Sequence, residues 1–246
     1  MTLRFRIESS SRIFETTDMN SVSKGALVVQ RLESLFGNVG FEDDFWRKRD
    51  EPFWLIADTI LSQNTSSANS EAASRSLFSR YRTVKAVYTA DIRDIERTVR
   101  QAGLYENKAR SISAVASEII EKHAGDTWSL IGGDYQSAKQ RLQQIVGIGP
   151  KTADVVLLFA RNFDIIPVDT HVFRVSRRIG LAPQKGGYEA VKMALEAEIP
   201  AGKRKFAHIA LIKLGREICV ARGPRHRKCP LTNLCDYYKE TSGEAN

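Results

Sequence analysis

The sequence has no long hydrophobic run and few cysteines. No apolar stretch approaches the ~20 residues that a membrane-spanning helix needs. The first residues, 1–11, carry Arg4 and Arg6 but lack the apolar core of a secretory signal. Three cysteines are too few, and odd in number, for a disulfide framework. We therefore expect a cytoplasmic protein without a membrane partner.

Strand patterns are also scarce. The one short β-branched run, 165–168, is broken by Pro167 and is typical of an extended connector. Elsewhere apolar residues recur at helical spacing, and Gly37, Pro52 and Asp91 mark helix ends. The pattern predicts helices over 27–36, from 52, over 68–81, after Asp91, over 104–123, 135–145 and 151–161, and three more after Asp169, Gly186 and Gly202. The fold class is therefore all-α.

The composition indicates a folded chain with a basic surface. Hydrophobic residues make up 42% of the 246 residues, enough for a sizeable core. The net charge of +8 favours a polyanionic partner, either nucleic acid or an acidic membrane surface. A basic protein without such a partner would have the same composition.

A glycine-rich turn lies between two predicted helices. Gly147 and Gly149 let the backbone approach a ligand without an intervening Cβ. The backbone N–H groups at the start of the following helix could bind a phosphate. Lys151 opens that helix, so its amine could reach the same anion or attack a carbon atom. A lysine is unusual at this position because its charge opposes the helix dipole, which instead favours a neutral amine.

Two further groups of residues could carry chemistry. Asp169, in the segment Val168-Asp169-Thr170-His171, is a suitable N-cap for the next helix, and 17 residues separate it from Lys151. All three cysteines, Cys219, Cys229 and Cys235, lie close together near the C-terminus. This clustering favours a binding site over scattered core packing.

The glycine turn, the V-D-T-H segment and the cysteine segment, in this order, resemble the endonuclease III family of base-excision DNA glycosylases over roughly 27–238. The resemblance implies two helical domains that flank a DNA-binding cleft. One is a six-helix barrel over 50–162 that ends with the helix-hairpin-helix motif. The other combines 21–49 with 163–240 and carries a metal-cluster loop, and residues 1–20 form an N-terminal extension.

The same resemblance implies a DNA N-glycosylase with AP lyase (β-elimination) activity on oxidised pyrimidines. In this family a lysine at the place of Lys151 is the nucleophile that forms a Schiff base. Asp169 then completes the site by stabilising positive charge or activating the nucleophile. The expected partner of this monomer is double-stranded DNA of the nucleoid that contains damaged bases or abasic sites.

Further residues are similar to the family's DNA contacts. Gln63, in the segment 61–65, resembles the side chain that fills the gap left by an extruded nucleotide, although a helix C-cap is the alternative. Leu104 resembles a wedge against the opposite strand, although a core leucine is the alternative. The backbone at Gly147 and Gly149, together with Arg222 and Arg225, is expected to contact phosphates, with a solvated basic face as the alternative for the arginines.

The family holds a [4Fe-4S] cluster with the spacing C-x6-C-x2-C-x5-C. The chain has Cys219, His226, Cys229 and Cys235 at these places, so histidine replaces the second cysteine. Imidazole can ligate iron, and zinc also accepts three cysteines and one histidine. The resemblance favours the iron–sulfur cluster. Loss of the metal, with His226 as a solvated loop residue, and zinc are the alternatives.

Two other functions remain open at this point. One is a mismatch-specific thymine or uracil DNA glycosylase, but those relatives typically lack the lysine. The other is a non-catalytic helix-hairpin-helix DNA-binding protein. The sequence gives no role to His123 or His208, and His171 is more simply a hydrogen-bonded buried histidine than a residue that orients Asp169.

Overall fold

The computed structural model describes residues 22–37 and 51–242. Within these ranges the chain forms 13 α-helices and three short 3₁₀ helices, without a strand. The all-α prediction is therefore confirmed. The predicted N-terminal extension, 1–20, lies outside the described residues. No helix in the described part is long and apolar enough to cross a membrane.

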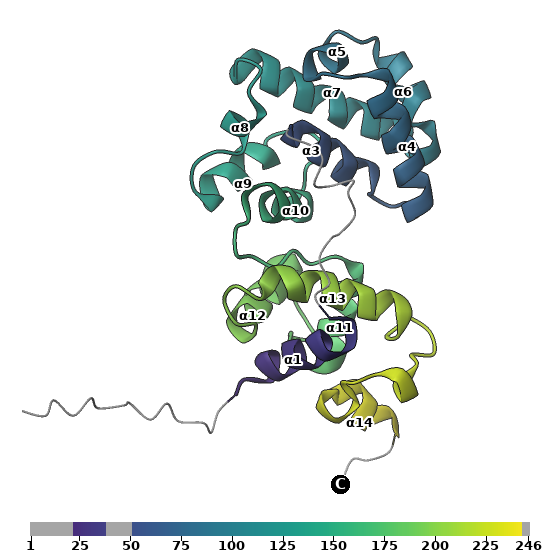
Figure 1. Cartoon of the computed structure of the whole chain (residues 1–246), viewed down its shortest axis with the longest axis vertical. Coiled ribbons are helices and arrows are strands. Elements are labelled where there is room, and N and C mark those ends of the chain that lie inside the picture. The colour runs from purple at the N-terminus through teal and green to yellow at the C-terminus, as the bar shows by residue number, and fades with distance from the viewer. Residues whose placement is uncertain (1–21, 38–50, 243–246) are drawn as a thin grey trace, which may run out of the picture.

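The central part of the chain, from α3 to α10, forms the upper body in Figure 1. Its elements are α3 (Pro52–Leu61), α4 (Ser67–Arg80), α5 (Val84–Tyr88), α6 (Ile92–Val99), η1 (Arg100–Ala102), α7 (Tyr105–Lys122), α8 (Thr127–Leu130), α9 (Tyr135–Gln143) and α10 (Pro150–Arg161). The expected helices all form. The two that the pattern did not reveal, α5 and α8, have five and four residues, too few to show a helical period.

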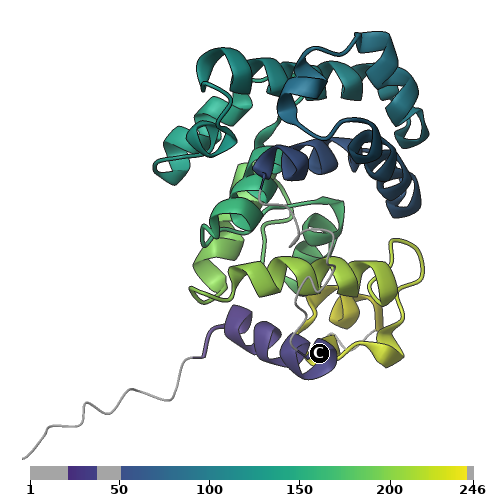
Figure 2. The ribbon, with the colours of Figure 1, turned by 45° about the horizontal axis from the view of Figure 1, so that its top comes forward.

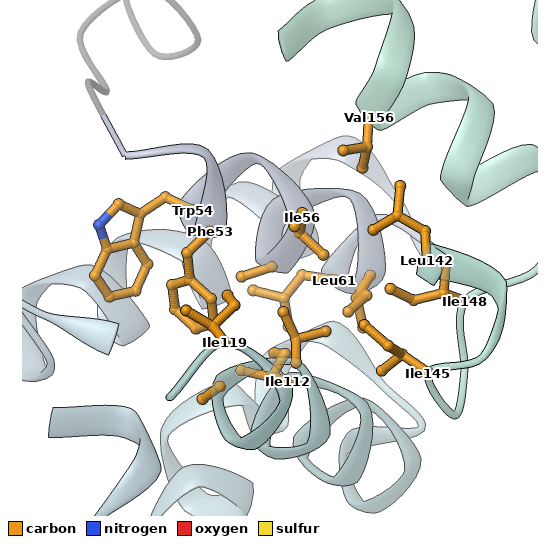
Figure 3. Packing of buried hydrophobic residues seen from close by; sticks show 14 of the residues in the cluster. Phe53, Trp54, Ile56, Leu61, Ile112, Ile119, Leu142, Ile145, Ile148 and Val156 are labelled. Carbon is orange, nitrogen blue, oxygen red and sulfur yellow. The ribbon is translucent and has the colours of Figure 1, made fainter. Parts of the chain in front are cut away.

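Helix α3 is the centre of this body. Nine of its ten residues are buried, and of these nine only Asp58 carries a charge. Its Pro52 occupies the first turn of the helix, where no backbone N–H is needed. Figure 3 shows Phe53, Ile56 and Leu61 packed against Ile112 and Ile119 of α7. The same cluster extends to Ile145 and Ile148, on either side of the glycine turn. The turn is thus anchored to the core of the upper body.

The N-terminal and C-terminal segments form the lower body in Figure 1. It contains α1 (Lys24–Phe36), α11 (Thr170–Ile179), α12 (Tyr188–Glu198), α13 (Arg204–Glu217), η2 (His226–Lys228), η3 (Thr232–Leu234) and α14 (Asp236–Ser242). Its own apolar cluster includes Val28 and Leu32 of α1, Val172 of α11 and Leu211 of α13. Helix α1, far from α13 in sequence, lies beside it in Figures 1 and 2.

The chain passes between the two bodies over residues 162–169. Asn162 ends α10 in the left-handed conformation, with φ of 52°. Ile165 belongs to the apolar cluster of the upper body and Ile166 to that of the lower body. Residues 165–168, around Pro167, are buried and do not pair with another segment as a β-strand, as the proline predicts. This segment carries the chain directly from α10 to Asp169 at the start of α11.

Candidate active site and DNA interface

A cavity of about 460 Å³ lies between the two bodies and contains both predicted catalytic residues. Lys151 enters it from the start of α10 and Asp169 from the start of α11. The wall from the lower body is completed by His208, Ile212 and Arg216 of α13. The opposite wall is polar and is formed by α3, α4 and the residues between them: Asp58, Thr59, Ser62, Ser67, Ser70, Glu71, Ser74 and Arg75.

The two glycines of the hairpin have different structural requirements. Gly147 has φ of +85°, and a Cβ built on it would overlap the Ser111 hydroxyl. Gly149 has an ordinary extended backbone, and a Cβ there would meet nothing within 4 Å. The fold therefore requires glycine at position 147. At position 149 the open space in front of the backbone remains available to a ligand.

The start of α10 is free of a capping side chain. Its N-cap is Gly149, which has none, and Pro150 occupies the first helical position. The N–H groups of the first turn, together with the positive end of the helix dipole, favour an anion at this place. Val146 is 65% exposed beside them, an unusual position for a valine, and makes the tip of the hairpin partly apolar.

Lys151 is held in conditions that favour its neutral amine. Burial lowers the pKa of Lys151, and the nearby charge of Arg216 lowers it further. The carboxylate of Asp169 acts in the opposite direction and raises this pKa. A lysine whose pKa is lowered in a cavity is a suitable nucleophile at neutral pH.

Asp169 is fixed as the N-cap of α11. Its Oδ1 accepts a hydrogen bond from the backbone N–H of Val172 at 2.7 Å, as expected for a capping aspartate. Its charge also raises the pKa of His171 and of His208 against the lowering caused by their burial. The cap and the cavity carboxylate are therefore one group, held in place by the helix that it begins.

The fold brings to the cavity two residues that no sequence motif indicates. His208 was given no role, but it lies in the cavity wall, 3% exposed, with Nδ1 donating to the carbonyl of Pro167 at 2.8 Å. The second is Arg216, which belongs to none of the sequence motifs. Both lie on α13, which packs against α11, and only this packing brings them beside Asp169.

Gln63 is placed next to the hairpin. Its Nε2 donates to the Gly147 carbonyl at 3.3 Å and to Thr152 Oγ1 at 3.1 Å. Its backbone N–H also donates to the Ile60 carbonyl at the end of α3. The alternative of a helix-end residue therefore holds for its backbone, while its side chain reaches across to the hairpin beside Lys151.

Leu104 lies on the surface, so the alternative of a core leucine is wrong. Its side chain is 58% exposed, and its φ of 47° is strained for a residue other than glycine. It follows Gly103, which also has positive φ, and is the N-cap of α7. An exposed leucine held in a strained turn is available to a partner.

The three cysteines and His226 line one apolar cavity in the lower body. Burial raises the pKa values of Cys229 and Cys235, and the neighbouring thiols raise them further. Such thiols become thiolates together only when positive charge is supplied among them. The donor set of three sulfurs and one imidazole in an apolar cavity therefore fits an iron–sulfur cluster.

The spacing of the four side chains bears on the kind of group that they could hold. In the described part of the chain, no three His, Cys, Asp or Glu side chains converge on a point that could hold one metal ion. Zinc needs such convergence, whereas each ligand of a four-iron cluster binds a different iron. The His226 ring meets the Tyr238 ring edge-on, with centroids 4.9 Å apart, so it is not simply a solvated loop residue.

The segment between Cys219 and Cys229 is fastened to α11. Arg178 donates to the carbonyls of Val220 at 2.8 Å and Ala221 at 2.9 Å. Arg222 is exposed just beyond this attachment, and exposed Arg225 donates to the Glu217 carbonyl at 3.1 Å. The fold thus presents both predicted phosphate-binding arginines at the surface, on a different part of the lower body from the Lys151 cavity.

Comparisons with known proteins agree with this geometry. Residues 57–201, more than half of the chain, match the family described as HhH-GPD superfamily base excision DNA repair protein. Endonuclease III of Bacillus subtilis (strain 168) is 32% identical over 184 residues, which cover 75% of this chain and 80% of that protein. Endonuclease III of Thermotoga maritima is 31% identical over 192 residues, covering 78% of this chain and 86% of the relative.

Solved structures give the same result. A trapped covalent intermediate of endonuclease III with DNA matches with a TM-score of 0.77 and 28% identity, over 90% of this chain and all of that one. A thermostable thymine-DNA glycosylase shares the fold, with a TM-score of 0.72, 88% of this chain, 97% of the other and 21% identity. The chain belongs to the HhH-GPD superfamily and, within it, to the endonuclease III family of base-excision repair DNA glycosylases and AP lyases.

Proposed function

We propose that Lys151 is the nucleophile of this glycosylase and AP lyase. Its neutral Nζ attacks C1′ of the extruded nucleotide, the bond from C1′ to the base breaks, and the base leaves with the bonding electrons. Opening of the sugar ring, with one amine proton passing to the ring oxygen, then gives a protonated imine between Nζ and C1′. Loss of a C2′ proton to water or to the departed base anion forms the C2′–C3′ double bond, and the 3′ phosphate leaves with the electrons of the C3′–O bond by β-elimination. The observation that carries this proposal is the presence of Lys151, with a lowered pKa, in the same cavity as Asp169.

We infer that Asp169 supplies the negative charge that this reaction needs. Positive charge develops on the sugar as the base departs, and a fixed carboxylate near it lowers the barrier. The hydrogen bond from Val172 to Oδ1 fixes the position of the carboxylate before the reaction begins. Asp169 is proposed to stabilise this charge or to help activate the amine of Lys151.

The proposed substrates are oxidised pyrimidines in duplex DNA. The polar wall of the cavity, from α3 and α4, offers hydroxyl, carboxylate and guanidinium groups to the edge of a base. Removal of thymine or uracil from mismatches is the second candidate, because a thymine-DNA glycosylase has the same fold. The lysine favours the first, since a glycosylase that uses water needs no amine at this place.

We propose duplex DNA bound across the junction of two domains, 50–162 and the combination of 21–49 with 163–240, in a monomer. The two separate apolar clusters support this division. Gln63 is proposed to fill the gap left by the extruded nucleotide and Leu104 to press on the opposite strand. Gly147 and Gly149, with Arg222 and Arg225, are proposed to contact phosphates.

We also propose that Cys219, His226, Cys229 and Cys235 hold a [4Fe-4S] cluster. The group would fasten the C-terminal segment, which has little apolar area of its own, to the lower body. Arg222 and Arg225 would then keep a fixed placement toward DNA.

The test is borohydride trapping on DNA that contains one abasic site. The wild type should form a covalent complex, and Lys151→Gln should form none while its affinity for the same DNA stays within about threefold. Lys185→Gln, an exposed lysine away from the cavity, is the matched control and should trap normally. Undiminished trapping by Lys151→Gln would show that Lys151 is not the nucleophile. Absence of trapping in the wild type would favour a glycosylase that forms no covalent intermediate.

A further inference from the structure

One buried lysine joins the two loops that carry Gln63 and Leu104. Lys108 lies in the first turns of α7, and only 3% of it is exposed. Its Nζ donates to the Leu61 carbonyl at 2.9 Å and to the Ala102 carbonyl at 2.8 Å. Within the described residues, these two backbone oxygens are the hydrogen-bond acceptors of this ammonium group.

Each acceptor stands at the base of one loop. Leu61 is the last residue of α3, two residues before Gln63. Ala102 is the last residue of η1, two residues before Leu104. The ammonium group therefore connects the loops at equivalent places, two residues before half-buried Gln63 and two residues before exposed Leu104.

Lys108 also fixes Leu104 from the other side. The backbone N–H of Lys108 donates to the Leu104 carbonyl at 3.1 Å, the first hydrogen bond of α7. Leu104 is thus held between its own helix and the carbonyl of Ala102. These two hydrogen bonds adjoin the left-handed backbone of Leu104 on either side.

The end of α3 explains why a cation is accepted in the interior. The last turn of a helix leaves carbonyl oxygens without partners and carries partial negative charge. Local donors serve the neighbouring oxygens: the N–H of Ser62 donates to Asp58, and the N–H of Gln63 to Ile60. The Leu61 oxygen receives its hydrogen bond from Lys108 instead.

Packing alone does not call for a lysine here. Burial lowers the pKa of Lys108 to about 8, so the interior disfavours its charge. A methionine would fill a similar volume without that cost. Only a side chain with several N–H donors can bind the carbonyls of Leu61 and Ala102 at once and so fix the distance between them.

We propose that Lys108 is a positioning residue that sets the spacing of Gln63 and Leu104, so that both reach one lesion in the duplex together. The inference rests on the proposed roles of these two residues. Gln63 is in turn bonded to the Gly147 carbonyl and to Thr152, beside Lys151. The contacts therefore run from Lys108 to the end of α3, and from Gln63 to Thr152, the residue after Lys151, which sets the wedge in register with the cavity.

The test compares Lys108→Met with Lys122→Met, which makes the same change at an exposed position of the same helix. Two single-turnover rates are measured for each: base removal from duplex DNA, and β-elimination at an abasic site in single-stranded DNA. Lys108→Met should lower the first rate about tenfold or more. It should leave the second within twofold of the wild type, because single-stranded DNA has no stack to fill and no opposite strand. Lys122→Met should change neither.

A double-mutant cycle with Leu104→Ala gives the second readout. Leu104→Ala should slow base removal in the wild-type background and add little in the Lys108→Met background, since the wedge is already misplaced there. Independent, multiplicative losses would overturn the inference, as would equal losses on duplex and single-stranded DNA. Lys108→Gln, whose neutral side chain is too short to bind both carbonyls, repeats the test if Lys108→Met does not fold, and should show the same selective loss. Lys108→Arg, which keeps the charge and several donors, should lose less.

The outcomes also separate this inference from the proposed function. If the wild type is trapped on abasic DNA but Lys108→Met behaves like Lys122→Met, the inference alone is wrong. If the wild type neither removes a base nor is trapped, the proposed function is wrong and the inference falls with it.

Discussion

Arg216 of α13 lies in the same cavity as Lys151 of α10, and its guanidinium lowers the pKa of that lysine. The two residues belong to different bodies of the fold and are 65 positions apart in the sequence. In the proposed reaction, which begins with the neutral amine of Lys151, the lower body of the molecule would therefore supply part of the activation of a residue carried by the upper body.

Loss of Arg216 is therefore expected to shift the pH profile of the lyase. Without this charge the pKa of Lys151 rises, so the amine is protonated over a wider range. In Arg216→Met the acid limb of the single-turnover trapping rate should move to higher pH. Arg216→Lys, which keeps a positive charge, should retain more of the wild-type profile. Saturating DNA is used throughout, so that weakened binding does not enter the rate. An unmoved acid limb would show that Arg216 does not control the amine.

Asp169→Asn should have the opposite effect on the same limb. The carboxylate raises the pKa of Lys151, so its removal should move the acid limb of trapping to lower pH. The rate of base removal should fall by about 10²–10³-fold, because the sugar becomes positively charged as the base leaves and the carboxylate that stabilises this charge is lost. The free energy of unfolding should change by less than about 1 kcal/mol, since asparagine is an equally good N-cap.

This variant separates the two accounts of Asp169. Normal base removal with unchanged stability would show that the residue is a cap and nothing more. A large loss of stability would show that the charge, rather than the capping oxygen, holds the start of α11.

The two hairpin glycines should respond differently to alanine. Gly147→Ala should lower the free energy of unfolding by about 2 kcal/mol or more, because positive φ is unfavourable for alanine and the new Cβ overlaps Ser111. Gly149→Ala should change it by less than about 0.5 kcal/mol, since its Cβ meets nothing. DNA affinity, however, should fall about tenfold in Gly149→Ala, the loss expected when one charged hydrogen bond to phosphate is blocked. Denaturant unfolding measures the free energy of unfolding, and DNA titration measures the affinity. Unchanged affinity in Gly149→Ala would show that no DNA phosphate binds at this position.

Much of the fold could be predicted because helix ends are signalled locally. Gly37, Asp91 and Asp169 end or cap helices where the sequence predicts them. Helices α5 and α8 could not be predicted, because four or five residues do not complete a hydrophobic period. The exposure of Leu104 was also open, since the helical pattern of α7 continues through it and only the left-handed backbone turns it outward.

From the sequence, site residues could be predicted only where they belong to a short motif within one continuous segment. Lys151 and Asp169 are part of short motifs, but His208 and Arg216 reach the cavity through the packing of α13 on α11. Lys108 had no signal at all, because its acceptors are backbone carbonyls and any residue type could provide them. Contacts of side chains with distant backbone are therefore what the sequence alone does not reveal.

His226 is the one histidine in the proposed cluster set of Cys219, His226, Cys229 and Cys235. If the imidazole binds iron, the purified wild type should contain about four irons and four sulfides per chain and absorb broadly near 400 nm. His226→Cys should keep this content and resist chelators longer, because a fourth thiolate replaces a neutral ligand. His226→Ala should lose iron or retain an incomplete cluster.

A packing role must be distinguished from a ligand role, because the His226 ring also contacts Tyr238 edge-on. His226→Phe keeps an aromatic edge at this place but has no nitrogen to donate. A ligand role predicts that His226→Phe loses iron as His226→Ala does, while a packing role predicts that it retains the wild-type content. Equal iron in all four proteins would show that histidine is not a ligand. Absence of iron in a wild type that still cuts abasic DNA would show that the C-terminal segment is fastened without metal, through contacts such as those of Arg178 with the carbonyls of Val220 and Ala221.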